Sequence, residues 1–149
     1  MEFRFTGCGS RLLLRWLVAG AAWAATSAAF AETFHVRLST VPIEAATAAA
    51  IAGQGAATAE LDGTRLTLKG SFAGLKGAAT TARLHEGRVT GVRGPAFADF
   101  SVPAAQGGNF TAEITLTPAQ ADGVRHGRVY VQIASASAPE GNLWGWLLP

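Results

Sequence analysis

The side chains best suited to chemistry in this sequence are its three histidines, His35, His85 and His126. None of them lies near a serine in the sharp strand-to-helix turn that activates a nucleophile. Two acids, Asp99 and Glu113, fall on predicted strands, but paired carboxylates indicate hydrolysis only in a cleft and at a defined separation. We interpret both as solvated acids on strand surfaces. We therefore expect no enzyme, no catalytic residue and no cofactor.

Two tryptophans near the C-terminus, Trp144 and Trp146, are the best candidates for a binding surface. Successive side chains of a strand point to opposite faces, so the two indoles share one face. Leu143, Gly145 and Leu147 occupy the other face. An exposed aromatic patch often marks a surface that binds a ligand or another protein.

The first 31 residues predict a signal peptide. They begin with three arginines, Arg4, Arg11 and Arg15. An apolar run from 12 to 31 includes the last of these arginines, and its uncharged core, 16–25, is too short to cross a bilayer, which takes ~20 residues. The run ends with Ala29 and Ala31 around Phe30, the small-x-small pattern that precedes cleavage. We expect cleavage after Ala31 and a mature domain over 32–149, the alternative being an uncleaved membrane anchor.

Charge and cysteine usage change once residues 1–31 are removed. The precursor has a pI of about 9.2. The predicted signal peptide holds three of the twelve basic residues and one of the ten acids, leaving nine of each. A neutral domain has no field to attract phosphates, so we expect no nucleic-acid partner. After signal cleavage we also expect no membrane attachment. Cys8, the single cysteine, leaves with the signal, which excludes a disulfide or thiolate site in a periplasmic or secreted product.

The remainder of the sequence shows the period-two alternation of β-strands. The clearest element is a hairpin of 56–61 and 64–70 around Asp62-Gly63, a type I′ turn pair. That turn predicts that Leu61 lies opposite Thr64, and Ala59 opposite Leu66. Further strands are predicted over 33–39, 79–85, 96–102, 110–116, 128–134 and 142–148.

Two segments depart from this pattern. Thr117 and Pro118 form a helix-start signature, with a capping threonine and proline at the first helical position, and predict a short helix before Gly127. The alanine-rich stretch 44–52 fits either a helical turn or a loop. About seven short strands and one short helix predict an all-β, antiparallel Greek-key or immunoglobulin-like sandwich.

An ordered set of motifs resembles the CHRD domain, a family named for its occurrence in chordin and found in many exported bacterial proteins. The matching segments are Phe72-Ala73-Gly74-Leu75, Ala82-Arg83-Leu84-His85-Glu86-Gly87, Gly108-Asn109-Phe110-Thr111, Leu116-Thr117-Pro118-Ala119-Gln120, Val129-Tyr130-Val131-Gln132-Ile133 and Pro139-Glu140-Gly141-Asn142-Leu143-Trp144-Gly145. Together they span nearly all of the mature chain. The resemblance implies an immunoglobulin-like or related Greek-key sandwich with a poorly defined molecular role.

This sequence departs from the family at its histidines. Family members usually carry His-x-His in the second of these motifs, and two such histidines on one strand with a third nearby can hold a metal. Here Arg83 stands at the first position and only His85 remains, while Ala134 and Ser135 replace a later His-Thr pair. We therefore expect no metal, with His85 as a weak candidate. The alternative is a copper-type or metal-dependent protein in which His85 meets His35 or His126.

The resemblance also bears on the two tryptophans. The family usually has polar residues at the positions of Trp144 and Trp146, which implies that this face meets solvent. Two indoles there form an apolar platform suited to a glycan or to an envelope protein. We therefore expect a non-catalytic binding module that uses this face, the alternative being that a loop or the N-terminal segment covers both rings.

Overall fold

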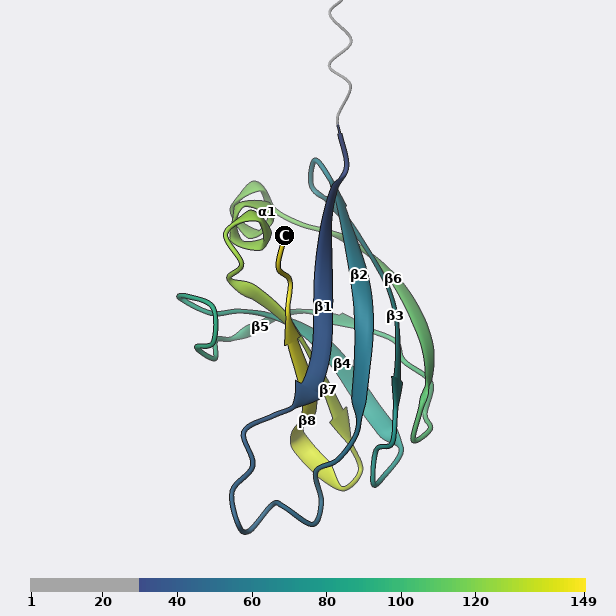
Figure 1. Cartoon of the computed structure of the whole chain (residues 1–149). Helices are drawn as coiled ribbons and strands as arrows, with labels where there is room; N and C mark the ends of the chain where they lie inside the picture. The colour runs from purple at the N-terminus through teal and green to yellow at the C-terminus, as the bar shows by residue number, and fades with distance from the viewer. Residues whose placement is uncertain (1–29) are drawn as a thin grey trace, which may run out of the picture.

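The computed structural model describes residues 30–149 as one β-rich domain with a single short helix (Figure 1). Its strands are β1 (Glu32–Thr40), β2 (Gln54–Asp62), β3 (Arg65–Ala73), β4 (Ala79–Glu86), β5 (Ala96–Phe100), β6 (Gly108–Thr115), β7 (Val129–Ser135) and β8 (Ala138–Trp146), and the helix is α1 (Pro118–Arg125). The eight strands match the segments expected from the alternation, although β5 is shorter and β8 begins four residues earlier than predicted. Within 30–149, no helix is long and apolar enough to span a membrane.

The predicted signal peptide falls almost entirely on residues 1–29, including Ala29, which lie outside the described part of the chain. Phe30 and Ala31 are exposed, and β1 begins at Glu32, the residue after the predicted cleavage site.

All strands belong to one antiparallel sheet in the order β5-β4-β7-β8-β1-β2-β3-β6. β1 pairs with β2 over seven residues, whereas only its last two residues, Ser39 and Thr40, pair with β8. The sheet folds over at β1, so that β1, β2, β3 and β6 face β4, β5, β7 and β8 (Figure 1). β3 and β6 are neighbours although β4 and β5 lie between them in sequence. This is the Greek-key arrangement of an immunoglobulin-like sandwich.

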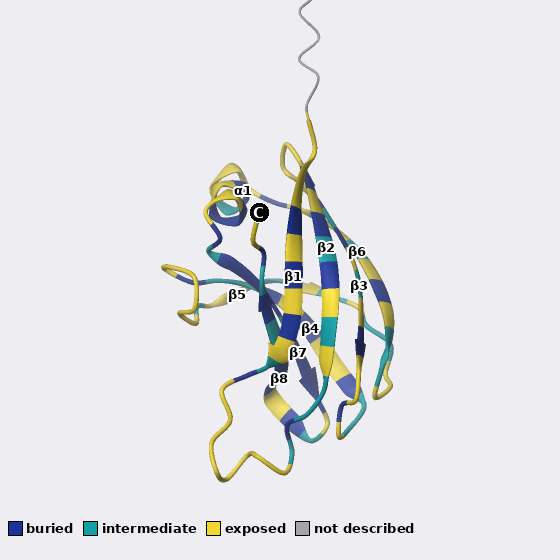
Figure 2. Cartoon of the chain, in the orientation of Figure 1, coloured by how far each residue is buried: buried dark blue, intermediate teal, exposed yellow. Residues whose placement is uncertain are grey.

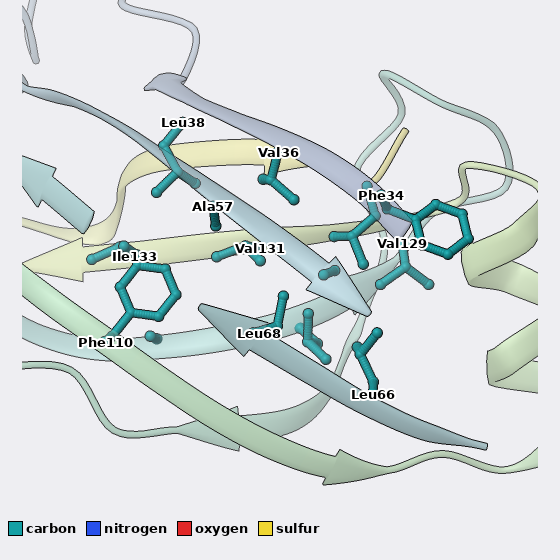
Figure 3. Packing of buried hydrophobic residues seen from close by; sticks show 14 of the residues in the cluster. Phe34, Val36, Leu38, Ala57, Leu66, Leu68, Phe110, Val129, Val131 and Ile133 are labelled. Carbon is teal, nitrogen blue, oxygen red and sulfur yellow. The ribbon is translucent and has the colours of Figure 1, made fainter. Parts of the chain in front are cut away.

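The core lies between the two halves and is built by the predicted alternation, visible along β1 in Figure 2. In Figure 3, Leu66 and Leu68 of β3 lie across the interior from Val129 and Val131 of β7. All four side chains are fully buried. Burial of each such side chain contributes about 1.5–3 kcal/mol, so this interior supplies the main stabilisation of a domain without disulfides.

The hairpin of β2 and β3 forms as expected, but the predicted register is wrong. The turn residues are Gly63 and Thr64, and Leu61 lies opposite Leu66. Only Gly63 has a positive φ, 60°, which suits the first central position of a type II′ turn and not the two left-handed residues of type I′. The shift of two residues keeps the same side chains inward. It also places two fully buried leucines side by side in place of a leucine and a threonine.

The short helix is confirmed, and its cap is as predicted. The Thr117 side chain accepts a hydrogen bond from the Gln120 amide, while the Gln120 side chain accepts one from the Thr117 amide. This reciprocal capping box follows from the Thr-Pro-Ala-Gln sequence. Ala121 and Val124 bury the inner side of α1 against the end of the sandwich.

The alanine-rich segment between β1 and β2 forms turns, one of the two alternatives considered. It is held against the β7–β8 end of the molecule. Buried Asn142 donates a hydrogen bond to the Ala52 carbonyl, and Ser137 donates one to the Ala50 carbonyl. Two polar side chains thus fix the loop that borders β8.

Candidate binding site

Trp144 and Trp146 lie on the face of β8 that is turned away from the core. The neighbouring residues of β8, Leu143 before Trp144 and Gly145 between the two tryptophans, are buried toward the interior, as is Leu147 just after the strand. Both tryptophans are half-buried. The sequence-based expectation that they share one face, opposite the leucines, agrees with this arrangement.

The strand register brings further side chains of β4 and β7 to the same face. Tyr130 of β7 lies between His85 and Trp146, its cross-strand neighbours. The Tyr130 ring stacks on His85 at a centroid separation of 4.9 Å and contacts Trp146 at 4.5 Å and Trp144 at 5.9 Å. The two tryptophans meet edge to face at 6.1 Å. We call these four residues the aromatic cluster.

Tyr130 is the centre of the aromatic cluster, and sequence reasoning missed it. Its side chain is only 1% exposed although it points away from the core. The loop between β4 and β5, residues 87–95, covers it. The Gly94 amide donates to the Tyr130 hydroxyl, and that hydroxyl donates to the Gly94 carbonyl. The sequence did hold a signal for it. Tyr130 lies between Val129 and Val131, and because side chains alternate along a strand, two inward valines direct Tyr130 outward.

His85 is fixed by the same loop. Its Nδ1 lies 2.9 Å from the Gly94 carbonyl oxygen, which can only accept, so Nδ1 carries the proton. The Nε2 atom is buried and has no hydrogen-bond partner among residues 30–149. With the proton on Nδ1, Nε2 carries a lone pair. Protein atoms enclose that lone pair, so a ligand cannot reach it in this conformation.

The three histidines occupy different environments. His35 is exposed on β1, and His126 caps α1, where its Nδ1 lies 3.2 Å from an Asp122 carboxylate oxygen. Within residues 30–149, no three histidine, cysteine or acidic side chains are grouped as metal ligands would be. Among these residues, the structure therefore offers no group of ligands for the alternative expected from the sequence, a metal site formed by His85 with His35 or His126.

Arg93, in the loop covering Tyr130, lies over the outer side of Trp144. Its guanidinium carbon is 5.5 Å from the centroid of the Trp144 ring, a cation–π contact. Trp144 also packs against a small apolar cluster of Val41, Ile51 and Ala138. Trp144 is thus enclosed on two sides, which explains why it is half-buried and not fully exposed.

Two hollows adjoin the aromatic cluster. The first, the sheet-face hollow, has a volume of about 290 Å³ and is lined by side chains of β4 and β7, including Arg83, His85, Tyr130 and Gln132. The second, the loop hollow, has a volume of about 470 Å³ and lies against the alanine-rich segment. Arg93, Pro139 and Glu140 line both hollows.

Of the charged groups around this face, Arg83 and Arg128 are held in ion pairs, whereas Arg93 and Glu140 are in none within residues 30–149. Arg83 donates to Asp99 of β5 at 2.9 Å. Arg128 contacts Asp122 at 3.1 Å and Glu86 at 3.4 Å, and the hydrogen bond to Asp122 is the main reason that the pKa of Arg128 is raised. Arg93 forms no ion pair with any residue of 30–149.

The two candidate acids of the sequence are each held by an arginine of a neighbouring strand. Asp99 pairs with Arg83, and Glu113 of β6 lies 3.8 Å from Arg65 of β3. Both carboxylates are largely exposed. This geometry is that of solvated surface ion pairs, which contribute little to stability.

Comparison with known proteins gives one match. The family model described as the CHRD domain matches residues 34–147. This range runs from Phe34, the first buried residue of β1, to Leu147, just after β8. The match therefore includes the helix and all eight strands, with β1 from its third residue. No curated protein and no solved structure matches the chain.

Proposed function

The chain belongs to the CHRD domain family, and from this premise we propose that it is a non-catalytic binding module of the periplasm or cell exterior. The binding surface is the aromatic cluster with its adjoining hollows, and Trp144 and Trp146 contribute its half-exposed rings. Its partner is an envelope protein or an envelope glycan.

The aromatic cluster is the observation that carries this proposal. It lies outside the sandwich core, on a sheet face where an ordinary soluble domain has polar side chains. Aromatic rings beside a concave surface with a few placed polar groups are typical of binding sites. The loop of 87–95 orients Tyr130 and His85 through hydrogen bonds to Gly94, so the surface is organised before any partner arrives.

Export is supported by the position of the first strand. The predicted cleavage after Ala31 separates the signal peptide from β1, which begins at Glu32. Processing there leaves every strand of the fold intact. A binding role is supported over catalysis because His85 contacts the Gly94 carbonyl and His126 contacts Asp122, and within residues 30–149 neither ring is hydrogen-bonded to a hydroxyl or thiol nucleophile.

The proposal is tested by replacing both half-exposed rings. The double variant Trp144→Ala, Trp146→Ala is expected to keep its β-sheet circular dichroism spectrum and to lose capture of envelope components. The measurement is affinity capture from the native envelope fraction, with proteins identified by mass spectrometry and glycans by compositional analysis.

A matched control is Thr58→Ala with Thr67→Ala, two half-buried residues on the outer face of the other half of the sandwich. This control is expected to capture the same components as the unmodified protein. Unfolding of the tryptophan variant would identify both rings as core residues and contradict the proposal. Equal capture by all three proteins would also contradict it.

A further inference from the structure

The sheet-face hollow has the composition of a site for a small charged ligand. Two arginines, Arg83 and Arg93, line it together with the single acid Glu140. The mature domain as a whole carries equal numbers of basic and acidic residues. Arg83 is already paired with Asp99, so Arg93 is the lining guanidinium that is left to pair with an anionic group inside the hollow.

The two arginines differ in how they are held. Arg83 is fixed on β4 by its 2.9 Å contact with Asp99. Arg93 extends from an exposed loop, has no ion pair within residues 30–149, and rests on the Trp144 ring. A carboxylate in the hollow can pair with the Arg93 guanidinium in the bidentate geometry that arginine favours. Moving Arg93 toward that carboxylate uncovers the outer side of Trp144.

The remaining lining favours a ligand that also has hydroxyl groups and an apolar face. Glu140 offers a carboxylate, which accepts hydrogen bonds and repels a simple anion. Gln132 and Thr81 add neutral polar groups, and the buried Tyr130 ring meets the hollow only at its margin. These donors and acceptors, with the Trp144 ring beneath Arg93, match a sugar ring that carries one acid group.

An extended acidic peptide fits this site less well. Peptides commonly bind a sheet by pairing with an unpaired edge strand. β7 lies between β4 and β8, so its backbone is already paired on both sides. A ligand here is recognised by side chains alone.

We propose that the sheet-face hollow binds a carboxylate-bearing sugar residue of an envelope glycan. This inference rests on the proposed binding function and names its ligand class. Arg93 holds the carboxylate, Gln132 and Glu140 hold the hydroxyls, and Trp144 covers one side of the sugar once Arg93 has moved.

The test uses protein expressed from the full coding sequence and labelled with ¹⁵N, titrated with methyl β-D-glucuronide and with methyl β-D-glucoside. These probes differ only in a carboxylate against a hydroxymethyl group. We expect the glucuronide to bind at least about tenfold more tightly, with shifts of the indole N–H signals of Trp144 and Trp146, and to weaken as salt is added.

Arg93→Gln is expected to reduce glucuronide affinity to that of the glucoside. The matched control is Arg88→Gln, which removes the same charge from the same loop at a residue that lines neither hollow. Equal affinity for the two probes, equal weakening by both variants, or tighter binding of a tetraglutamate peptide would overturn the inference. Absence of sugar binding with capture of envelope proteins still dependent on the two tryptophans would overturn this inference and leave the proposed function standing.

Discussion

At the scale of single residues, Tyr130 determines the shape of the candidate site. Its ring supports His85 and both tryptophans, and its hydroxyl holds the covering loop at Gly94. Arg93 reaches Trp144 only because that loop is held in place. The site therefore depends on a buried residue that a partner would contact only at its margin.

Tyr130→Phe tests this role with the aromatic packing retained. The change leaves the Gly94 amide without its hydroxyl partner, and we expect a loss of about 1 kcal/mol in the free energy of unfolding. Urea denaturation measures that loss, and hydrogen exchange is expected to accelerate at the Gly94 amide. Exchange at Gly94 that stays as slow as in the unmodified protein would show that the loop is held by other contacts.

The sequence predicted part of this site. The shared face of Trp144 and Trp146 follows from the period of a strand, and the resemblance to family members implied that this face meets solvent. The contributions of Tyr130 and Arg93 were not predictable, because they depend on a loop with no periodic pattern. Where such a loop folds back is decided by the hydrogen bonds that Gly94 makes and not by its local sequence.

At the scale of elements, the signals that succeeded were those contained within one segment. Every strand was found from its alternation, and α1 from its cap and proline. The hairpin register failed because Asp62-Gly63 is a favourable turn pair by itself, whereas the pairing of Leu61 with Leu66 is decided by burial in the finished core. Local turn chemistry was outweighed by packing between the two halves.

Thr117→Ala tests the element that was predicted most completely. The substitution removes the side chain that accepts from the Gln120 amide at the start of α1, and we expect a loss of about 1 kcal/mol in stability. Thr117→Ser keeps the hydroxyl and is expected to retain most of the stability. The comparison is made by thermal denaturation, and equal destabilisation by both variants would show that the threonine methyl group, not the cap, matters.

At the scale of the whole molecule, the two halves of the sandwich are joined where β1 meets β8. Gly145 lies at this seam, and a Cβ there would be 2.5 Å from the carbonyl oxygen of Arg37. This backbone oxygen cannot rotate away from an added Cβ as the end of a flexible side chain could. The absence of a side chain at residue 145 is thus a condition for closing the fold.

Gly145→Ala is expected to destabilise the domain by about 1–3 kcal/mol through this overpacking. Denaturation in urea measures the loss, and the indole signals of Trp144 and Trp146 are expected to shift because their strand is displaced. The control Gly91→Ala adds the same methyl group where no atom lies within 4 Å, although Gly91 has a positive φ of 87° and a smaller loss is expected there. A loss at Gly145 no greater than that at Gly91 would contradict tight packing at the seam.

The pairing of β1 with β8 joins the first strand of the domain to the last. Contacts between such distant segments form late and slowly, because the chain between them must first be ordered. If the chain is exported as we propose, it can complete this sandwich only after its C-terminal strand has emerged from the translocation channel. The same delay would keep the proposed precursor unfolded for longer beforehand, which is the state that a narrow channel accepts.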